Sequence, residues 1–272
     1  MHVTSLGFRT DLALLTSSGS IVEDRGTHLV VRTPDNPAYF WGNFLLLAEA
    51  PVPGGEREVV GAFRTEFPRA DHVSIGIDVP DLSDESRAAF EAAGLVVDVA
   101  TVLTASSLVA PREVEAEIRA LDSDDDWEGR ARLSHALYPG MPEQRFMTFA
   151  RGKNVQERRL ADAGRGRRFG AFVDGALVST AAAYVTEDGV ARFQSVETHP
   201  DHRRRGLAAA VVHAAGRHAL DHLGTRTLVI VADTDGEAIG VYRRLGLADA
   251  ERQLMLELRS GDWATDRAKH EN

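Results

Sequence analysis

Residues 195–209 read Ser195-Val196-Glu197-Thr198-His199-Pro200-Asp201-His202-Arg203-Arg204-Arg205-Gly206-Leu207-Ala208-Ala209. This order predicts the end of a strand, a tight basic turn and the start of an alanine-rich helix. Three arginines stand together in a chain whose formal net charge is -10. The first N–H groups of a helix have no intrahelical partner and carry the positive end of the helix dipole. Together with the guanidinium groups they predict a phosphate or pyrophosphate site. The alternative is a solvated basic turn that caps an ordinary helix.

Composition excludes several classes of protein. A length of 272 residues predicts one large or two medium domains, and the acidic balance disfavours binding to nucleic acid. The absence of cysteine excludes disulfides, thiolate zinc sites and a cysteine nucleophile. No apolar run reaches the roughly 18 residues of a membrane helix, and no basic, apolar start indicates a secretory signal. A cytoplasmic protein with no membrane partner is therefore expected.

Hydrophobic periodicity and turn residues predict alternating strands and helices. The predicted strands are residues 28–32, 39–48, 72–79, 95–104, 170–173, 177–186, 190–198, 227–232 and 254–258, and the predicted helices are 8–15, 58–67, 83–93, 113–121, 143–161, 206–223 and 235–245, with Asp235 as a cap. Residues 105–111 are expected to be a linker and 122–128 a solvated acidic loop. Residues 151–168 carry seven cations against two carboxylates. They predict an exposed basic face or, alternatively, a contact for the acidic end of a nucleotide.

The order of these elements predicts an α/β fold with a mixed sheet. A helical crossover between residues 190–198 and 227–232 is of the length that joins parallel strands. Asp174-Gly175 is a strong turn dipeptide, so the strands around it are expected to form an antiparallel hairpin.

The chain also contains a weak internal repeat. Residues 77–95 align with 229–247 without gaps and share five identities in 19 positions. Two copies of one unit are therefore predicted, with domains 1–107 and 108–260 and a polar tail 261–272. The first copy has no basic cluster in 50–55, and it has Phe90 where the second has Tyr242.

Two short motifs in the second copy resemble one known family. Arg203-x-x-Gly206-x-Ala208 resembles the Q/R-x-x-G-x-G/A signature of the GNAT superfamily of acyl-CoA-dependent N-acyltransferases. Residues 241–247 resemble its Y-x-x-x-G-F segment, with Leu247 in place of phenylalanine. Relatives often have an asparagine near the start of the helix predicted at 235–245, and Asp235 is the residue closest to that position in this sequence. The resemblance implies tandem GNAT-like domains, each with a mixed central sheet flanked by helices, of which the first is a degenerate copy.

The resemblance also implies how acetyl-CoA, as co-substrate, would be held. Backbone amides of Val196 and Thr198 would hold the pantetheine arm. The pyrophosphate would be held by the three arginine side chains and the amides of the helix start, that is by Arg203, Arg204, Arg205, Gly206, Leu207, Ala208 and Ala209.

Two side chains are candidates for proton transfer. An amine with a pKa near 10.4 is mostly charged at neutral pH, and Glu197 is the candidate base. Its alternative is a strand-end carboxylate that faces solvent or pairs with an arginine of the turn. Tyr242 is the candidate acid for the leaving CoA thiolate, and its alternative is an aromatic ring that packs on the sheet. His218 and His222 are spaced i, i+4 but have no apparent third ligand, so no metal is expected.

The expected function is acetyl transfer from acetyl-CoA to a primary amine by direct attack. The alternative is an acyl-CoA-binding sensor or regulatory module without turnover. The acceptor is a small molecule or peptide amine, expected to bind near residues 121–150 and the first domain. The state of assembly is left open between monomer and homodimer.

Overall fold

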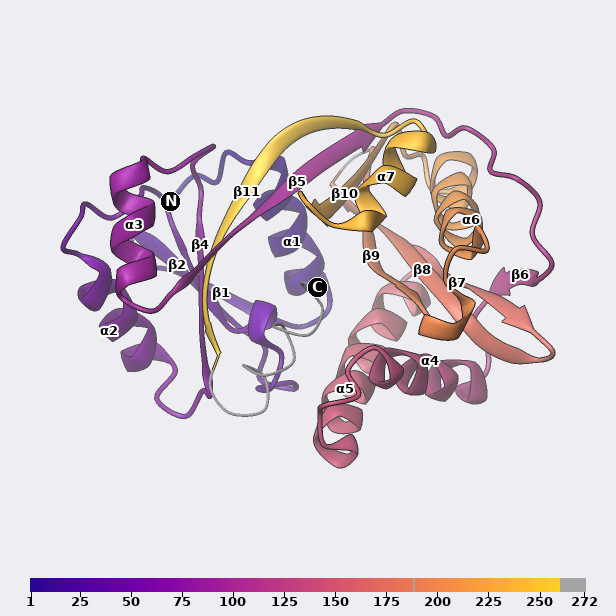
Figure 1. The fold of residues 1–272 in the computed structure, drawn as a ribbon, viewed down its shortest axis with the longest axis horizontal. Helices are drawn as coiled ribbons and strands as arrows, with labels where there is room; N and C mark the ends of the chain where they lie inside the picture. Colours follow the sequence, from indigo (N-terminus) through magenta and orange to yellow (C-terminus); the bar gives the residue numbers. More distant parts are fainter. Residues whose placement is uncertain (188, 260–272) are drawn as a thin grey trace. The chain divides into compact units, whose positions relative to one another are not determined.

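The computed structural model describes residues 1–187 and 189–259, and the predicted tail 261–272 lies outside them. These residues form seven α-helices and eleven strands (Figure 1). Hydrogen bonds join the strands in the order β1-β2-β3-β4-β11-β5-β10-β9-β8-β7-β6. The chain divides into two compact units: unit 1 is Met1–Val102 with the described residues from Glu251 on, and unit 2 is Leu103–Ala250.

Unit 1 consists of a mixed sheet with three α-helices. Its elements are α1 (Leu6–Ser17), β1 (Ile21–Asp24), β2 (His28–Arg32), a short 3-10 helix (Phe40–Gly42), β3 (Phe44–Leu47), α2 (Glu56–Glu66), β4 (His72–Ile77), α3 (Asp84–Ala92) and most of β5 (Val96–Ala105) and β11 (Ala248–Arg259). Strands β3 and β4 are parallel, whereas β1–β2, β2–β3 and β4–β11 are antiparallel. Leu45, Phe63 and Ile75 form part of its buried core.

The position of β11 corrects the predicted assignment of 108–260 to the second domain. Leu254 pairs with Ile77 and Leu258 with Val73 of β4, so this part of β11 lies in unit 1. Leu254 and Leu256 are fully buried in the unit 1 core. The apolar pattern identifies a strand, but it does not identify the neighbour with which the strand pairs.

Unit 2 contains the predicted crossover. Its elements are β6 (Glu117–Ala120), α4 (Asp124–Ala136), α5 (Glu143–Asp162), β7 (Gly166–Val173), β8 (Ala176–Glu187), β9 (Val190–Thr198), a 3-10 turn (Pro200–His202), α6 (Leu207–His222), β10 (Thr227–Asp233) and α7 (Glu237–Arg244). Strands β6 to β9 form antiparallel pairs, and β10 runs parallel to β9. The predicted mixed sheet, the hairpin at Asp174-Gly175 and the parallel crossover are confirmed.

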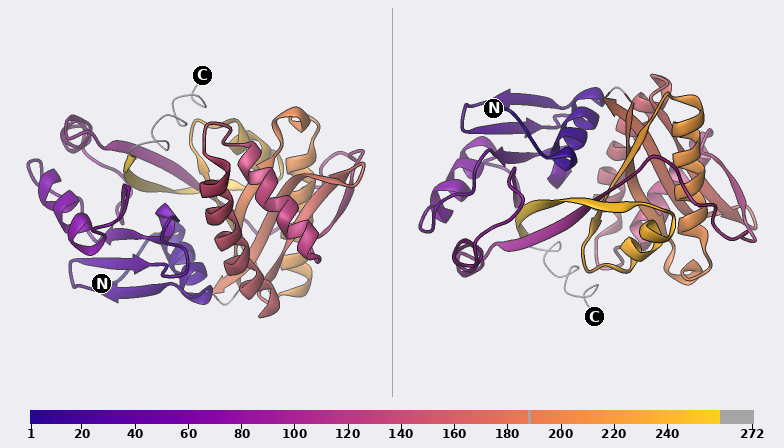
Figure 2. Two further views of the ribbon diagram at one scale, coloured as in Figure 1. Left: turned by 90° about the horizontal axis from the view of Figure 1, so that it is seen from below. Right: turned by 90° about the horizontal axis from the view of Figure 1, so that it is seen from above.

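Helices cover both faces of the unit 2 sheet. Helix α6 packs on β7, β8 and β9, and its Val211 and Ala215 share a core with Ala181 and Ala183 of β8. Successive strand residues point to opposite faces, so Thr180, Ala182 and Tyr184 point to the other face. That face carries α4 and α5, which lie side by side (Figure 2).

Two predicted elements are wrong because tertiary pairing or capping overrides local propensity. The predicted helix 113–121 contains strand β6, which pairs with β7. The predicted acidic loop contains the start of α4, where Ser123 and Asp126 form a capping box. Carboxylates favour a first helical turn because they complement the helix dipole.

Two boundaries also differ from the predictions. The predicted strand 39–48 begins with the 3-10 helix Phe40–Gly42, so only Phe44–Leu47 is extended. Gly236, and not Asp235, is the N-cap residue of α7. The N–H of Asp235 donates to the side chain of Asp233 instead.

Candidate active site

A cavity that is open to solvent lies between strands β9 and β10 where their pairing ends. The parallel ladder joins Val190–Arg192 to Thr227–Val229. Beyond it, the two strands and α7 line a cavity of about 250 Å³. Its walls include Ser195 and Val196 from β9, Ile230 and Ala232 from β10, and Tyr242 from α7. An elongated ligand can therefore reach backbone groups that a continuous sheet would have paired.

A bulge in β9 shapes one wall of this cavity. The β8–β9 register shifts between the pairs Ala182–Gln194 and Thr180–Glu197, and Ser195 has a φ of 42°. A positive φ costs a non-glycine residue about 1–2 kcal/mol. His199 N–H donates to Val178 of β8, so by alternation the N–H of Thr198 points away from β8. Val196, the other residue with a predicted amide contact, lies in the bulge and lines the cavity.

The basic turn leads directly into α6. Arg204 has a φ of 63° and Gly206, the N-cap residue, has a φ of 80°. The first N–H groups of α6, those of Leu207, Ala208 and Ala209, have no intrahelical partner. Gly206 offers no side chain to accept a hydrogen bond from them. The helix start predicted after the basic turn is therefore present, and the chain enters it through a left-handed residue, Gly206.

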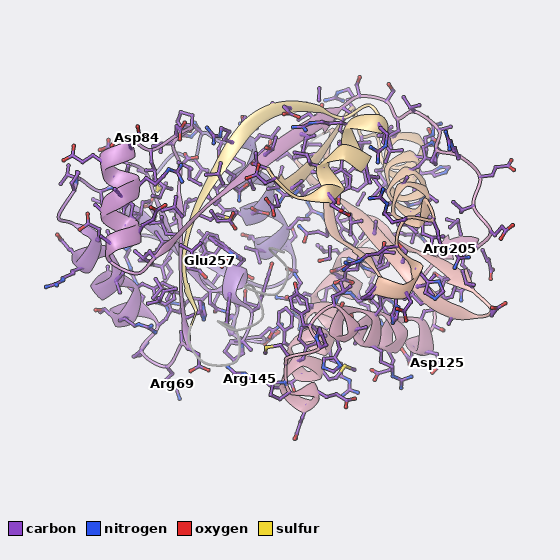
Figure 3. All side chains as sticks on the ribbon, viewed as in Figure 1. Arg69, Asp84, Asp125, Arg145, Arg205 and Glu257 are labelled. Atoms are coloured by element: carbon purple, nitrogen blue, oxygen red, sulfur yellow. The ribbon has the colours of Figure 1, made fainter. Side chains whose placement is uncertain are left out.

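The three arginines of the turn are exposed and only loosely paired. Arg204 lies 3.9 Å from the exposed carboxylate of Glu237, and Arg205 contacts His202 at 3.0 Å. Arg205 is labelled in Figure 3. Exposed pairs of this kind contribute about 0–1 kcal/mol, so little energy opposes rotation of these side chains toward an anion.

Tyr242 is buried in the cavity wall and is 5% exposed. Burial disfavours the phenolate and raises the pKa of Tyr242 well above its usual value of 10. The side chain packs in the unit 2 core with Ile239 and Leu245. The packing expected as an alternative is thus present, and the side chain also lines the cavity.

Glu197 lies outside the cavity lining and on the face that carries α4. Its carboxylate accepts a hydrogen bond from Ser134 Oγ at 2.7 Å and lies 3.5 Å from Arg130 Nε. Both partners come from α4. The arginine that pairs with Glu197 therefore comes from this helix and not from the basic turn.

A buried ionic cluster next to Glu197 was missed by the sequence analysis. Arg168, Glu157 and Arg130 are 1%, 2% and 2% exposed. Arg168 donates to Glu157 from Nε at 2.8 Å, and Arg130 lies 3.5 Å from the same carboxylate. The predicted basic face thus ends in a buried arginine. The signal available was the alternation of β7, which directs Arg168 to the face opposite its neighbour Phe169.

Other cations of that segment pair with carboxylates of α4. Arg151 bonds Glu128 and Arg158 bonds Asp124, both at 2.7 Å. Asp125, in the same first turn of α4, is labelled in Figure 3.

The chain is similar in sequence and in fold to known proteins. Residues 134–247, less than half of the chain, match the sequence model of the Acetyltransferase (GNAT) family. A GCN5-related N-acetyltransferase from Kribbella flavida is 19% identical, with a TM-score of 0.63 over 96% of this chain and 99% of that chain. A functionally unknown conserved protein from Staphylococcus epidermidis is 14% identical, with a TM-score of 0.65 over 89% and 94%. A tandem GNAT protein from the clavulanic acid biosynthesis pathway is 16% identical, with a TM-score of 0.50 over 92% and 88%.

The fold is that of the GNAT acetyltransferases, and the family match suggests acyl transfer from acyl-CoA as the class of chemistry. No curated protein matched the sequence. Within residues 1–187 and 189–259, no helix is long and apolar enough to cross a membrane. The same residues contain no group of three or more side chains suited to hold a metal ion.

Proposed function

We propose that this protein is an N-acetyltransferase that transfers an acetyl group from acetyl-CoA to a primary amine by direct attack. The observation that carries the proposal is the cavity between β9 and β10, whose wall includes Tyr242. Strand β9, which forms one side of this cavity, leads through the basic turn to the start of α6. A pyrophosphate on that turn can extend an arm along β9 toward the tyrosine.

The proposed contacts follow from this path of acetyl-CoA along β9. The backbone amides of Val196 and Thr198 donate hydrogen bonds to the pantetheine arm, which lies along β9 like an additional strand. The amides at the start of α6 bind the pyrophosphate, and Arg203, Arg204 and Arg205 neutralise its charge.

The proposed chemistry uses one side chain on each face of β9. Glu197 accepts the proton of the ammonium group, directly or through a water, and the free amine attacks the thioester carbonyl carbon. The C–N bond forms, the C–S bond breaks, and Tyr242 donates its proton to the thiolate of CoA. The attacking nitrogen loses its second proton as the amide forms, and a proton from solvent restores the phenol of Tyr242. A phenol of raised pKa is a weak acid, so the donation requires a positioned hydrogen bond in the transition state.

We also propose that unit 1 is a degenerate copy that does not bind acyl-CoA. The series β3–α2–β4–α3 has the same order of elements as β9–α6–β10–α7, and each contains one pair of parallel strands. In unit 1 the parallel ladder between β3 and β4 continues to the end of β3. Leu47 pairs with Ile77, and its carbonyl oxygen accepts a hydrogen bond from Asp78 N–H. At the start of α2, Glu56 accepts the N–H of Gly54 at 2.8 Å. A carboxylate there disfavours a pyrophosphate.

Calorimetric titration with acetyl-CoA tests the proposal, with Gly206→Asp and a matched control, Gly175→Asp. Both glycines have nearly equal φ values, 80° and 79°, but Gly175 lies in the β7–β8 hairpin turn. We expect one site per chain, retained in Gly175→Asp and lost in Gly206→Asp. Absence of binding by the wild type would refute the function, and two sites per chain would refute the silent unit 1.

A panel of primary amines, assayed for CoA thiol release, then tests turnover. Acetylation of at least one amine supports the enzyme. Binding without turnover across the panel would favour the acyl-CoA sensor instead.

A further inference from the structure

We infer that Arg168 is a positioning residue that holds the β9 bulge in the shape required by an acyl-CoA arm. The inference rests on the proposed function, because it assigns a role to a buried side chain beneath the proposed cofactor strand. Arg168 lies on β7 and does not line the cavity. It therefore acts through the backbone of β9 and not by contact with a ligand.

The guanidinium group of Arg168 bonds the bulge itself. Nη1 donates to the carbonyl oxygen of Ser195 at 3.1 Å, and Nη2 donates to that of Gln194 at 3.2 Å. These are the residues at which the β8–β9 ladder shifts register. A carbonyl group that leaves a ladder inside a protein needs another donor, and a charged donor is stronger than a neutral one.

The remaining donors of Arg168 are also used. Nη1 reaches Thr180 Oγ1 at 3.3 Å, Nε reaches Glu157 at 2.8 Å, and Nη2 reaches the same carboxylate at 2.6 Å. An arginine has five N–H groups, and five contacts are present. The side chain is therefore fixed in one orientation, and that orientation fixes the two carbonyl groups.

The sheet provides a path for this side chain. Arg168 pairs with Ala182 of β8, and Ala182 pairs with Gln194 of β9, so the three residues form one row. Side chains opposite one another in a ladder share a face. Because alanine offers only a methyl group, the arginine can cross β8 and reach the third strand. A larger residue at 182 would occupy this path.

Helix α5 keeps Arg168 charged and in place through Glu157. Burial raises the pKa of Glu157, but the charges of Arg168 and Arg130 outweigh it and lower that pKa to about 2. Tyr184 also donates to this carboxylate at 3.3 Å. The support for the bulge thus persists over the range of pH in which an enzyme of this class works.

Two variants test the role of Arg168. Arg168→Lys retains the charge that Glu157 needs, but its compact ammonium group lacks the planar fork whose separate nitrogens reach the carboxylate and the two carbonyl groups. The second variant, Glu157→Gln with Arg168→Met, removes both charges, because a single deletion leaves an unpaired buried ion. The matched control is Arg167→Lys, an exposed neighbour that pairs with Asp122 at 3.1 Å.

Two measurements separate this inference from the proposed function. Amide hydrogen exchange of residues 193–199 without ligand reports on the bulge, and calorimetry reports on acetyl-CoA. We expect faster exchange in that segment and a Kd for acetyl-CoA raised about tenfold or more. The KM for acetyl-CoA should rise while the KM for the amine stays unchanged, and Arg167→Lys should behave as the wild type.

The outcomes are distinct. Wild-type exchange in a folded Arg168→Lys protein would overturn the inference, as would faster exchange with an unchanged Kd. If the wild type does not bind acetyl-CoA, the proposed function fails. The exchange of residues 193–199 then decides alone whether Arg168 holds the bulge.

Discussion

Tyr242 of α7 and Ser195 of the β9 bulge line the same cavity, although 46 positions separate them in the sequence. The phenol of Tyr242 forms part of one wall of the cavity, and the irregular backbone of the β9 bulge forms part of another. A reacting group carried along β9 would therefore arrive beside a buried proton donor. This relationship makes the acid role of Tyr242 directly testable.

We predict that Tyr242→Phe lowers kcat for acetyl transfer about 10²-fold, the lower end of the range for general acid catalysis. Phenylalanine fills the same buried space, so the Kd for acetyl-CoA should stay within about twofold of the wild type. Steady-state kinetics and calorimetry measure the two quantities. Tyr39→Phe in unit 1 is the matched control. An unchanged kcat would remove the acid role but not the proposed function.

The pH profile gives a second prediction for the same residue. Burial raises the pKa of Tyr242, so the phenol stays protonated as the pH rises to 10, where an ordinary tyrosine is about half ionised. We therefore expect kcat to hold its plateau between pH 8 and 10. An alkaline loss with a midpoint below 10 that disappears in Tyr242→Phe would contradict the assignment.

Glu197→Gln should lower kcat about 10²–10⁴-fold and leave the Kd for acetyl-CoA unchanged. The amide removes the basic oxygen, but it keeps an acceptor for Ser134 and leaves Arg130 paired with Glu157. Ser134→Ala is the control, because it removes the donor and keeps the carboxylate. If Glu197→Gln retains the wild-type kcat, Glu197 only pairs with Arg130.

Local sequence signals predict several elements of unit 2. The dipeptide Asp174-Gly175 predicts the β7–β8 hairpin because only a few residues accept a positive φ, and both do so here. The arginine turn likewise predicts the helix start that the structure contains. These features depend on residues adjacent in sequence, which is why the sequence alone reveals them.

Features that depend on distant partners were not predictable in the same way. Strand β6 has helix-forming residues such as Glu117 and Ala120, but the edge of β7 makes it a strand. The pairing of β11 with β4 joins Leu254 to Ile77, and no local pattern encodes that choice. Arg168 belongs to the segment 151–168, whose seven cations predict an exposed basic face. The sequence does not show that α5 and β7 bring Arg168 and Glu157 together in a buried pair.

The stability of α4 provides a last prediction, because one carboxylate joins its cap to β6. Asp126 accepts bonds from Arg119 Nη1 at 2.7 Å and Nη2 at 2.8 Å. Its second role is in the capping box with Ser123. The hydrogen bonds from Arg119 lower the pKa of Asp126 well below its usual value, although burial opposes the shift. The folded state therefore favours the ionised carboxylate.

A depressed pKa adds stability above the unfolded pKa of about 3.9, and this contribution is lost as the pH falls through the folded pKa. We expect Asp126→Asn to lower the free energy of unfolding by about 1–3 kcal/mol at pH 7. The difference should shrink at pH 3, because protonation of the unfolded carboxyl removes part of the advantage. Urea unfolding followed by tryptophan fluorescence measures it, with exposed Asp125→Asn as control. An equal loss at both pH values would show that Asp126 acts through shape and not through charge.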